Sequence, residues 1–386
     1  MDISLRTKQL IKLFSYDKKV ELGDSCPDMM PFRFVQSDRG DEVAHLQKEL
    51  MTTGFCSVTD DCIDENTNFN YTVFVPASAG NGKEKRNEAI ILLHGLNERN
   101  WNKYLTWAEH LVKNTGKPVI LFPIAFHMNR TPSIWYNPRT VLPWVNARKQ
   151  EVGDLDNSTF ANVALSSRIS KQPLRFYVSG LESAYDILQL TREIKRGEHP
   201  LFNENASVNI FAYSIGALLS QVILLANPER LFTDTRLFMF CGGSIFSEMN
   251  GNARDILDKE ASLRLMNYYT HDFLLQELSR MTPNENISLE QAFRMMICPD
   301  IMTEQRESFF QSACNRIRAI SLKKDVVIPT QGIIKALGKT PQKILEELDF
   351  PFPYSHQIPF PVNECDYNES VNKAFGCVFD RAASFL

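Results

Sequence analysis

One serine stands where an apolar strand pattern gives way to an apolar helix pattern. The stretch "NIFAYSIGALLS", residues 209–220, is mostly apolar on both sides of Ser214. A tight turn between a strand and a helix leaves the side chain at its centre exposed, which suits a nucleophile. A serine hydroxyl is a weak nucleophile and needs a general base, usually a histidine oriented by a carboxylate. The chemistry open to Ser214 therefore depends on which acids and bases follow the other strands.

Apolar runs of strand length recur along the chain and alternate with longer helical patterns. The alternation in residues 70–76, "NYTVFVP", predicts a half-buried antiparallel strand. Residues 181–197 predict a helix that Gly197 closes. Strands that alternate with helices predict an open, doubly wound and mostly parallel sheet. Continuous apolar runs predict the strands buried on both faces of that sheet, at residues 89–95, 118–126, 208–214, 236–243 and 316–322.

Chemically useful side chains follow three of these predicted strands. Ligands bind beyond the carboxyl ends of the strands in such sheets, so the residues at those ends are the candidates for chemistry. His94 follows one strand, Ser214 follows another, and Asp325 follows a third, with His356 farther along the chain. A serine, an aspartate and a histidine therefore occur in that order.

These features resemble the α/β-hydrolase superfamily. Its G-x-S-x-G nucleophile elbow is matched by Ala212-Tyr213-Ser214-Ile215-Gly216, in which Ala212 replaces the first glycine. The resemblance covers roughly residues 69–386, with a weak zone at 132–171, and is strongest to uncharacterised bacterial proteins of the superfamily. It implies an α/β-hydrolase fold, with a mostly parallel doubly wound sheet flanked by helices.

The resemblance also implies roles for the acid and the base. In the superfamily the acid follows the serine and the histidine follows the acid. Asp325 opens a D-x-x-x-P stretch of the kind that carries the acid, whereas its rival Asp349 lies in a helix-to-loop segment. His271 precedes Asp325 and would invert the order. The expected catalytic triad is therefore Ser214, Asp325 and His356.

An oxyanion formed in acyl transfer needs two main-chain donors. The N–H group of Ile215, directly after the nucleophile, is one expected donor. The His94-Gly95 pair makes Leu96 the second by resemblance, with Asn97 as the fallback. His94 itself is expected to fix this loop by hydrogen bonding rather than to serve as a second base.

Residues near the mouth of the predicted site are candidates for binding substrate. Arg130, in "FPIAFHMNRTPSIWYNPR", has two interpretations: its guanidinium binds an anionic group of the substrate, or it belongs to an ordered loop with ion pairs. The possible substrate-binding residues are His94, Asn97, His127, Arg130 and Tyr213.

Four segments are predicted along the chain. They are an N-terminal extension at 1–66, the first part of the hydrolase core at 67–249, a helical cap insertion at 250–315 and the second part of the core at 316–386. Within the cap, Ser288 and Gln291 form a predicted capping box. Apolar cap residues either line an acyl pocket or pack the cap onto the core; these are Met266, Tyr269, Phe273, Met295, Met296 and Phe310.

Composition narrows the classes of function. The 386 residues carry a net charge of -4 and no basic run with interleaved aromatics, which argues against nucleic acid as a partner. No apolar run reaches the roughly 18 residues that span a membrane, and no secretory signal is recognised at the N-terminus. The 8 cysteines form no C-x-x-C pair and suggest reduced thiols in a cytoplasmic protein. No metal or nucleotide motif occurs, so no cofactor is expected.

The expected function is a cofactor-independent serine hydrolase that cleaves a small-molecule ester or acyl substrate by acyl transfer. An acyltransferase or a peptidase would use the same triad. The competing class is a non-catalytic hydrolase-fold protein that binds a ligand or a partner, because fold alone does not establish activity.

Overall fold

A single sheet of eight strands organises the part of the chain that the structure describes. The computed structural model describes residues 2–23, 26–37, 39–50, 59–77, 84–153, 155, 157–275, 287–362 and 365–386. The strand order is β1-β2-β4-β3-β5-β6-β7-β8, and β2 runs in the direction opposite to that of the other seven strands. The strands are β1 Asp28–Val35, β2 Asn68–Val75, β3 Arg86–Leu93, β4 Val119–Leu121, β5 Phe202–Tyr213, β6 Leu237–Phe240, β7 Ile317–Leu322 and β8 Leu345–Leu348.

The predicted mostly parallel sheet is confirmed, and so is the antiparallel strand β2. The five continuous apolar runs all contain parallel strands, although β4 has only three residues of the run at 118–126. Two strands, β1 and β8, were not predicted. Both lie at the edges of the sheet, where one side lacks a neighbouring strand and a polar sequence such as "LEEL" in β8 is tolerated.

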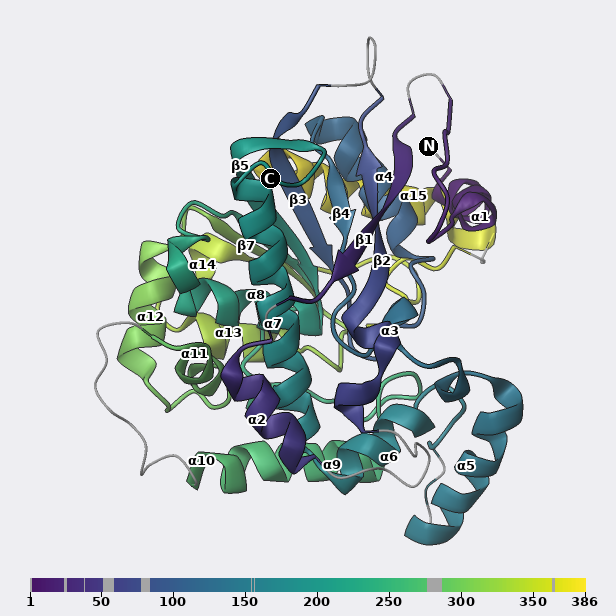
Figure 1. Cartoon of the computed structure of the whole chain (residues 1–386), viewed down its shortest axis with the longest axis vertical. Coiled ribbons are helices and arrows are strands. Elements are labelled where there is room, and N and C mark those ends of the chain that lie inside the picture. The colour runs from purple at the N-terminus through teal and green to yellow at the C-terminus, as the bar shows by residue number, and fades with distance from the viewer. Residues whose placement is uncertain are drawn as a thin grey trace.

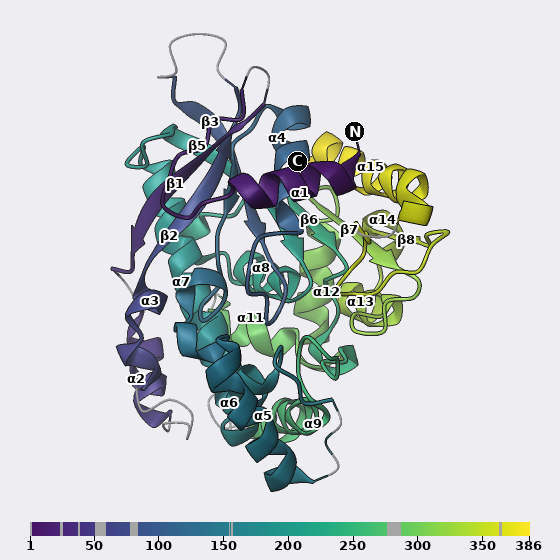
Figure 2. The same ribbon diagram turned by 90° about the vertical axis from the view of Figure 1, so that its right-hand side faces the viewer.

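Helices cover both faces of the sheet (Figures 1 and 2). Helices α7 (Leu174–Lys195) and α8 (Ile215–Ala226) lie on one face, and α4 (Tyr104–Thr115) and α15 (Asn368–Phe385) lie on the other. The remaining helices are α1 Ile3–Leu13, α2 Asp41–Glu49, α3 Asp64–Thr67, α5 Pro138–Val152, α6 Val163–Lys171, α9 Lys259–Asn267, α10 Phe273–Leu275, α11 Leu289–Met295, α12 Thr303–Ser312, α13 Thr330–Leu337 and α14 Pro341–Ile344.

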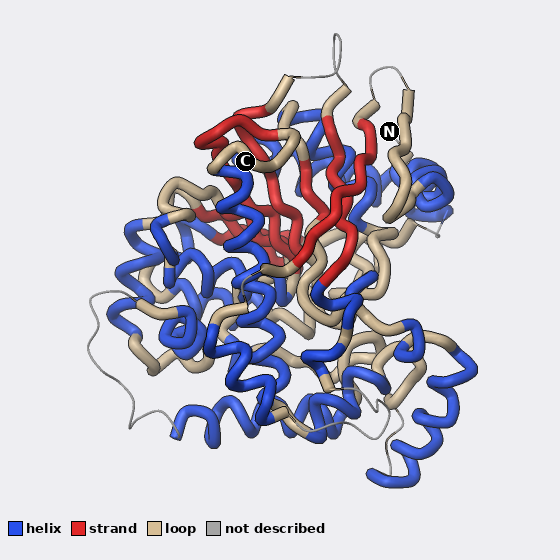
Figure 3. The backbone as a smooth tube through the Cα atoms, viewed as in Figure 1, coloured by secondary structure: helices blue, strands red, loops and turns tan. Residues whose placement is uncertain are grey.

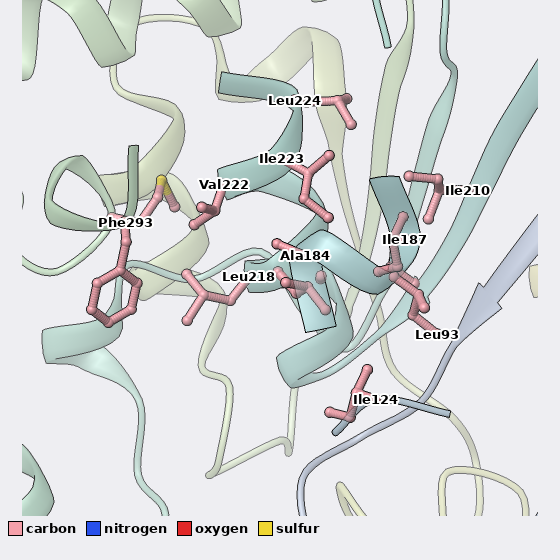
Figure 4. Packing of buried hydrophobic residues seen from close by; sticks show 14 of the residues in the cluster. Leu93, Ile124, Ala184, Ile187, Ile210, Leu218, Val222, Ile223, Leu224 and Phe293 are labelled. Atoms are coloured by element: carbon pink, nitrogen blue, oxygen red, sulfur yellow. The ribbon is translucent and has the colours of Figure 1, made fainter. Parts of the chain in front are cut away.

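Alternate residues of the central strands feed two separate cores. Leu93 of β3 and Ile210 of β5 join the core under α7 and α8, which also contains Leu218 and Val222 of α8 (Figure 4). Phe211, the next residue of β5, joins the aromatic core under α4 and α15. This burial on both faces explains the continuous apolar runs in the sequence. Gly197 has a φ of +68° just after α7, as expected for a glycine that closes a helix.

The segment before residue 67 contributes to the fold of the core. Its strand β1 pairs with β2 along the whole of its length, from Asp28 to Val35. Its helix α1 lies beside α4 and α15 (Figure 2). Arg6 of α1 forms an ion pair of 2.6 Å with the fully buried Glu109 of α4. The main-chain N–H of Ile3 donates to the side chain of Asn372 on α15 at 2.9 Å.

Several helices lie beyond the carboxyl ends of the parallel strands (Figures 1 and 3). Among them, α9 comes from the predicted cap insertion, while α5 and α6 come from the zone at 132–171 where the resemblance is weak. The later helices of the insertion lie along the sheet instead, since α11 packs on α8 and α12 packs on α13. The capping box of Ser288 and Gln291 at the start of α11 is confirmed. The domain boundaries themselves stay a prediction.

A buried ion pair joins the two chain segments that cover the strand ends. Asp258 accepts hydrogen bonds from Nε and Nη2 of Arg148 on α5, the latter at 2.8 Å. The same carboxylate caps α9 by accepting the N–H of Ala261 at 2.9 Å. Both charged side chains are almost completely buried. One aspartate therefore fixes the start of α9 and its position against α5.

Replacing this aspartate tests its role in stability. We expect Asp258→Ala to lower the free energy of unfolding by about 3–5 kcal/mol, because it strands a buried guanidinium and removes a helix cap. The measurement is urea unfolding followed by circular dichroism. Asp255→Ala is the matched control, since residue 255 is exposed three positions earlier. Equal losses in the two variants would contradict this role.

Candidate active site

The turn at Ser214 has an unusual backbone. Ser214 joins β5 to α8 with a φ of 55° and a ψ of -121°, a conformation that side-chain-bearing residues rarely adopt. Neighbouring strands approach it closely. A Cβ atom on Gly216 would lie 2.9 Å from the carbonyl oxygen of His94, and one on Gly242 would lie 2.9 Å from that of Ser214. The methyl group of Ala212 is buried in the core under α8, so the departure from the usual motif is accommodated.

The structure brings Ser214, His356 and Asp325 together in one hydrogen-bonded chain. Ser214 Oγ lies 2.7 Å from Nε2 of His356, and Nδ1 of His356 lies 2.7 Å from Oδ2 of Asp325. The other carboxylate oxygen of Asp325 accepts the N–H groups of Val327 and Ile328, each at 2.9 Å. When Nδ1 of a neutral His356 donates to Asp325, Nε2 is left to accept the proton of Ser214. The arrangement matches the geometry that a serine nucleophile requires.

The two rival residues lie elsewhere. Asp349 is partly exposed, accepts the hydroxyl of Tyr354 at 2.9 Å and has Lys324 3.6 Å away. His271 is exposed on a short π-helix, Tyr268–Asp272, and its Nδ1 contacts the carbonyl oxygen of Asn267 at the end of α9. Both residues are thereby engaged with other partners.

His356 is held in place by a tyrosine that is adjacent to the nucleophile in the sequence. The hydroxyl of Tyr213 donates to the carbonyl oxygen of His356, and the two rings stack with centroids 5.4 Å apart. Nζ of Lys103 lies 4.6 Å from the centroid of the Tyr213 ring and donates to the carbonyl oxygen of Gln357 at 3.2 Å. Burial raises the pKa of Tyr213 well above its ordinary value, so its hydroxyl stays a donor. The sequence analysis did not single out Lys103.

His94 fixes the loop that follows β3. Its Nε2 accepts the N–H of Ile124 at 3.1 Å, and its Nδ1 donates to the carbonyl of Gly95 at 2.8 Å. The N–H of Gly95 donates in turn to the hydroxyl of Tyr104, which donates to Glu98, both at 3.0 Å. Burial lowers the pKa of His94 well below its ordinary value and keeps the ring neutral. Tyr104 was missed because it lies in the following helix, outside the loop that the sequence highlights.

Asn97 connects the same loop to the covering helices. Its N–H donates to Nε2 of His127 at 2.9 Å, so this group is already engaged and the fallback oxyanion donor is not available. Its side-chain amide donates to the carbonyls of Ala161 and Asp255, at 2.7 and 2.8 Å. Leu96 and Ile215, the two expected donors, both line a cavity beside Ser214.

Arg130 does not face the cleft. Its guanidinium is fully buried, lies 2.7 Å from a carboxylate oxygen of Asp186 and donates to the carbonyls of Asn66 and Pro123. The interpretation of Arg130 as a binder for an anionic substrate group is therefore wrong for this structure. The alternative, an ordered loop with ion pairs, is the arrangement found, although the pair is buried.

Ser214 lines two cavities. A cleft of about 800 Å³ also contains His356 and runs beside α1 and the loop at 353–362. A smaller cavity of about 50 Å³ also contains Ile215 and Met266. The other apolar cap residues under consideration are buried in the core and line none of the cavities described, namely Tyr269, Phe273, Met295, Met296 and Phe310.

Within the described ranges, no group of three or more histidine, cysteine, aspartate or glutamate side chains is placed to hold a metal ion. None of the helices in the described part of the chain is both long and apolar enough to cross a membrane.

The strand order, the single antiparallel strand β2 and the strand-serine-helix turn define the α/β-hydrolase fold. The chain belongs to a family of unknown function, DUF6051, whose model matches residues 8–386. No curated protein matches the sequence significantly.

Solved structures of esterases and of a peptidase are similar to the chain at low sequence identity. The hyperthermophilic esterase of the archaeon Pyrobaculum calidifontis is 11% identical, with 98% of this chain and 89% of the esterase covered and a TM-score of 0.44. Carboxyl esterase 2 of the fungus Tuber melanosporum is 10% identical, with 99% of this chain and 97% of the esterase covered and a TM-score of 0.47. The acylaminoacyl peptidase of Pyrococcus horikoshii is 11% identical, with 92% of this chain but 41% of the peptidase covered and a TM-score of 0.45.

The buried histidines make stability depend on pH. Burial lowers the pKa of His127 and of His199 to about 4 in the folded protein, whereas a histidine in the unfolded chain has a pKa of about 6.5. Their contribution to stability is therefore complete above pH 6.5 and is lost as the pH falls toward 4. We expect His127→Gln to flatten the fall in unfolding free energy between these values, measured by urea unfolding. His271→Gln, at an exposed position, is the control and should keep the original slope. An unchanged slope in His127→Gln would contradict the assignment.

Proposed function

We propose that this protein is a cofactor-independent serine hydrolase that acts by acyl transfer on carboxylic esters. The observation that carries the proposal is the hydrogen-bonded chain from Ser214 through His356 to Asp325, which begins at a strained turn. Strain of this kind costs about 1–3 kcal/mol and is concentrated at functional sites. The buried carboxylate, the imidazole and the hydroxyl are the parts that nucleophilic acyl transfer needs.

The proposed reaction has two stages. Ser214 Oγ attacks the carbonyl carbon while Nε2 of His356 takes its proton, and Asp325 stabilises the resulting imidazolium. The oxyanion is held by the N–H groups of Leu96 and Ile215. His356 then donates the proton to the departing alcohol oxygen and an acyl-Ser214 ester remains. Water attacks this ester, gives a proton to His356, and releases the carboxylic acid as Ser214 recovers its proton.

Esters are favoured over amides because an alkoxide needs less assistance to leave. An acyltransferase would replace water by another alcohol or amine in the second stage, with the same residues. The competing possibility is a ligand-binding protein whose serine is inert. Against it stands the retention of all three residues at hydrogen-bonding distance, since a protein without acyl transfer has no need of them.

A covalent probe separates the enzyme from the binder. We expect a fluorophosphonate to label the wild type at Ser214 and p-nitrophenyl acetate to be hydrolysed, with turnover about a million-fold lower in Ser214→Ala. Ser220→Ala is the matched control, because this buried serine six residues later donates its hydroxyl to the carbonyl of Gly216 within α8. Folded wild type that neither reacts with the probe nor hydrolyses the ester would favour the binder.

The identity of the acid can be tested separately. Asp325→Asn should lower kcat about 10⁴-fold, because an amide cannot hold His356 in the required tautomer or stabilise its charged form. Asp349→Asn should leave kcat nearly unchanged, since its carboxylate interacts with Tyr354 and lysines at the surface. Steady-state kinetics on one ester with both variants distinguishes the residues. A larger effect at Asp349 would reverse the assignment.

A further inference from the structure

Ser214 stands between two cavities of very different size. The large cleft has a volume of about 800 Å³ and the small cavity one of about 50 Å³. Leu96, Ser214 and Ile256 line both of them, so the two cavities adjoin one another at the serine. A substrate whose reacting carbon lies at Ser214 therefore extends one group into each cavity.

Proton transfer decides which group occupies which cavity. In acyl transfer the histidine must reach the oxygen of the departing alcohol, so the alcohol lies on the side of His356. His356 lines the large cleft and does not line the small cavity, whereas Ile215, an expected oxyanion donor, lines the small one. We propose that the protein cleaves esters that join a short acyl group, of about two to four carbons, to a bulky alcohol. This inference rests on the proposed hydrolase function.

The walls of the small cavity limit the acyl chain. They include the side chains of Phe176, Phe246, Leu257 and Val327, all of which are buried and apolar. A cavity of about 50 Å³ admits only a few water-sized groups. Phe176 also lines two other cavities, of about 60 Å³ each, and so lies in the wall between the acyl space and both of them. Close packing around these side chains makes extension of the acyl space costly.

The large cleft suits a bulky alcohol. Its volume falls within the range of about 300–1,000 Å³ that is usual for ligand sites. Helix α1 supplies Ile3 and Ile11 to one wall, and Phe360 and Val362 contribute apolar surface from the loop that follows His356. The ion pair of the partly exposed Arg6 with the buried Glu109 holds α1 in this position. The N-terminal helix is therefore part of the proposed leaving-group site.

Two isomeric esters with the same molecular formula test whether the short group must be the acyl group and the long group the alcohol. Hexyl acetate and ethyl hexanoate contain the same atoms and differ in which side of the ester carries the long chain. We expect kcat/KM for hexyl acetate to exceed that for ethyl hexanoate by at least tenfold, measured by acid release at constant pH. Equal values, or a preference for ethyl hexanoate, would overturn the proposal.

A variant links the preference to the small cavity. Phe176→Ala joins this cavity to its neighbours and should raise kcat/KM for ethyl hexanoate relative to hexyl acetate at least tenfold; Phe176→Leu should act in the same direction if the alanine variant folds poorly. Phe273→Ala is the matched control, because Phe273 is buried in the same aromatic cluster yet lines none of the described cavities. An equal shift in the control would overturn the assignment of Phe176.

A structure of the Ser214→Ala variant with hexyl acetate separates this inference from the proposed function. If the wild type hydrolyses neither ester and resists fluorophosphonate, the hydrolase proposal fails, but the position of the bound ester still tests the cavities. An acetyl group beside Phe246 with the hexyl chain in the large cleft supports the inference. A reversed ester, or no bound ester, overturns it.

Discussion

The close approach of three strand ends around Ser214 is the constraint on which the site depends. A backbone with a φ of 55° at a serine persists only when its surroundings hold it there. Gly216 and Gly242 permit that contact, because a side chain on either would collide with main-chain atoms of its neighbours. The burial of β3, β5 and β6 on both faces supplies the stabilisation that offsets the strain.

The loop beside the nucleophile is fixed by neutral histidines. Each ring of His94 and His127 uses one nitrogen to accept a main-chain N–H and the other to donate to a carbonyl. This dual role requires the neutral form, which burial favours by lowering both pKa values. A loop held in this way before substrate arrives needs little reorganisation, and fixed donors stabilise an oxyanion best when they are preorganised.

The parallel strands that are buried on both faces of the sheet could be predicted from the sequence, whereas the two strands at its edges could not. Ser214 and Asp325 follow strands buried on both faces, where continuous apolar runs give a clear signal. The edge strand β8 has the polar sequence "LEEL", and the edge strand β1 is interrupted by Pro31 and Arg33; neither was predicted. Two interpretations of Arg130 stayed open because a position along the chain does not reveal that its guanidinium turns inward to Asp186. The contribution of α1 to the cleft depends on long-range contacts that no local pattern encodes.

Hydrogen bonds connect the covering helices to the site. Asn97 binds the main chain of Ala161 and of Asp255, and it directly follows Leu96, the expected oxyanion donor. Asp258, three residues after Asp255, is locked to Arg148 on α5. A displacement of α5 or α9 would therefore be transmitted through Asn97 to the loop beside Ser214. Because Ile256 lines both cavities at Ser214, the same segment both borders the site of the serine and supports the loop of the expected donor Leu96.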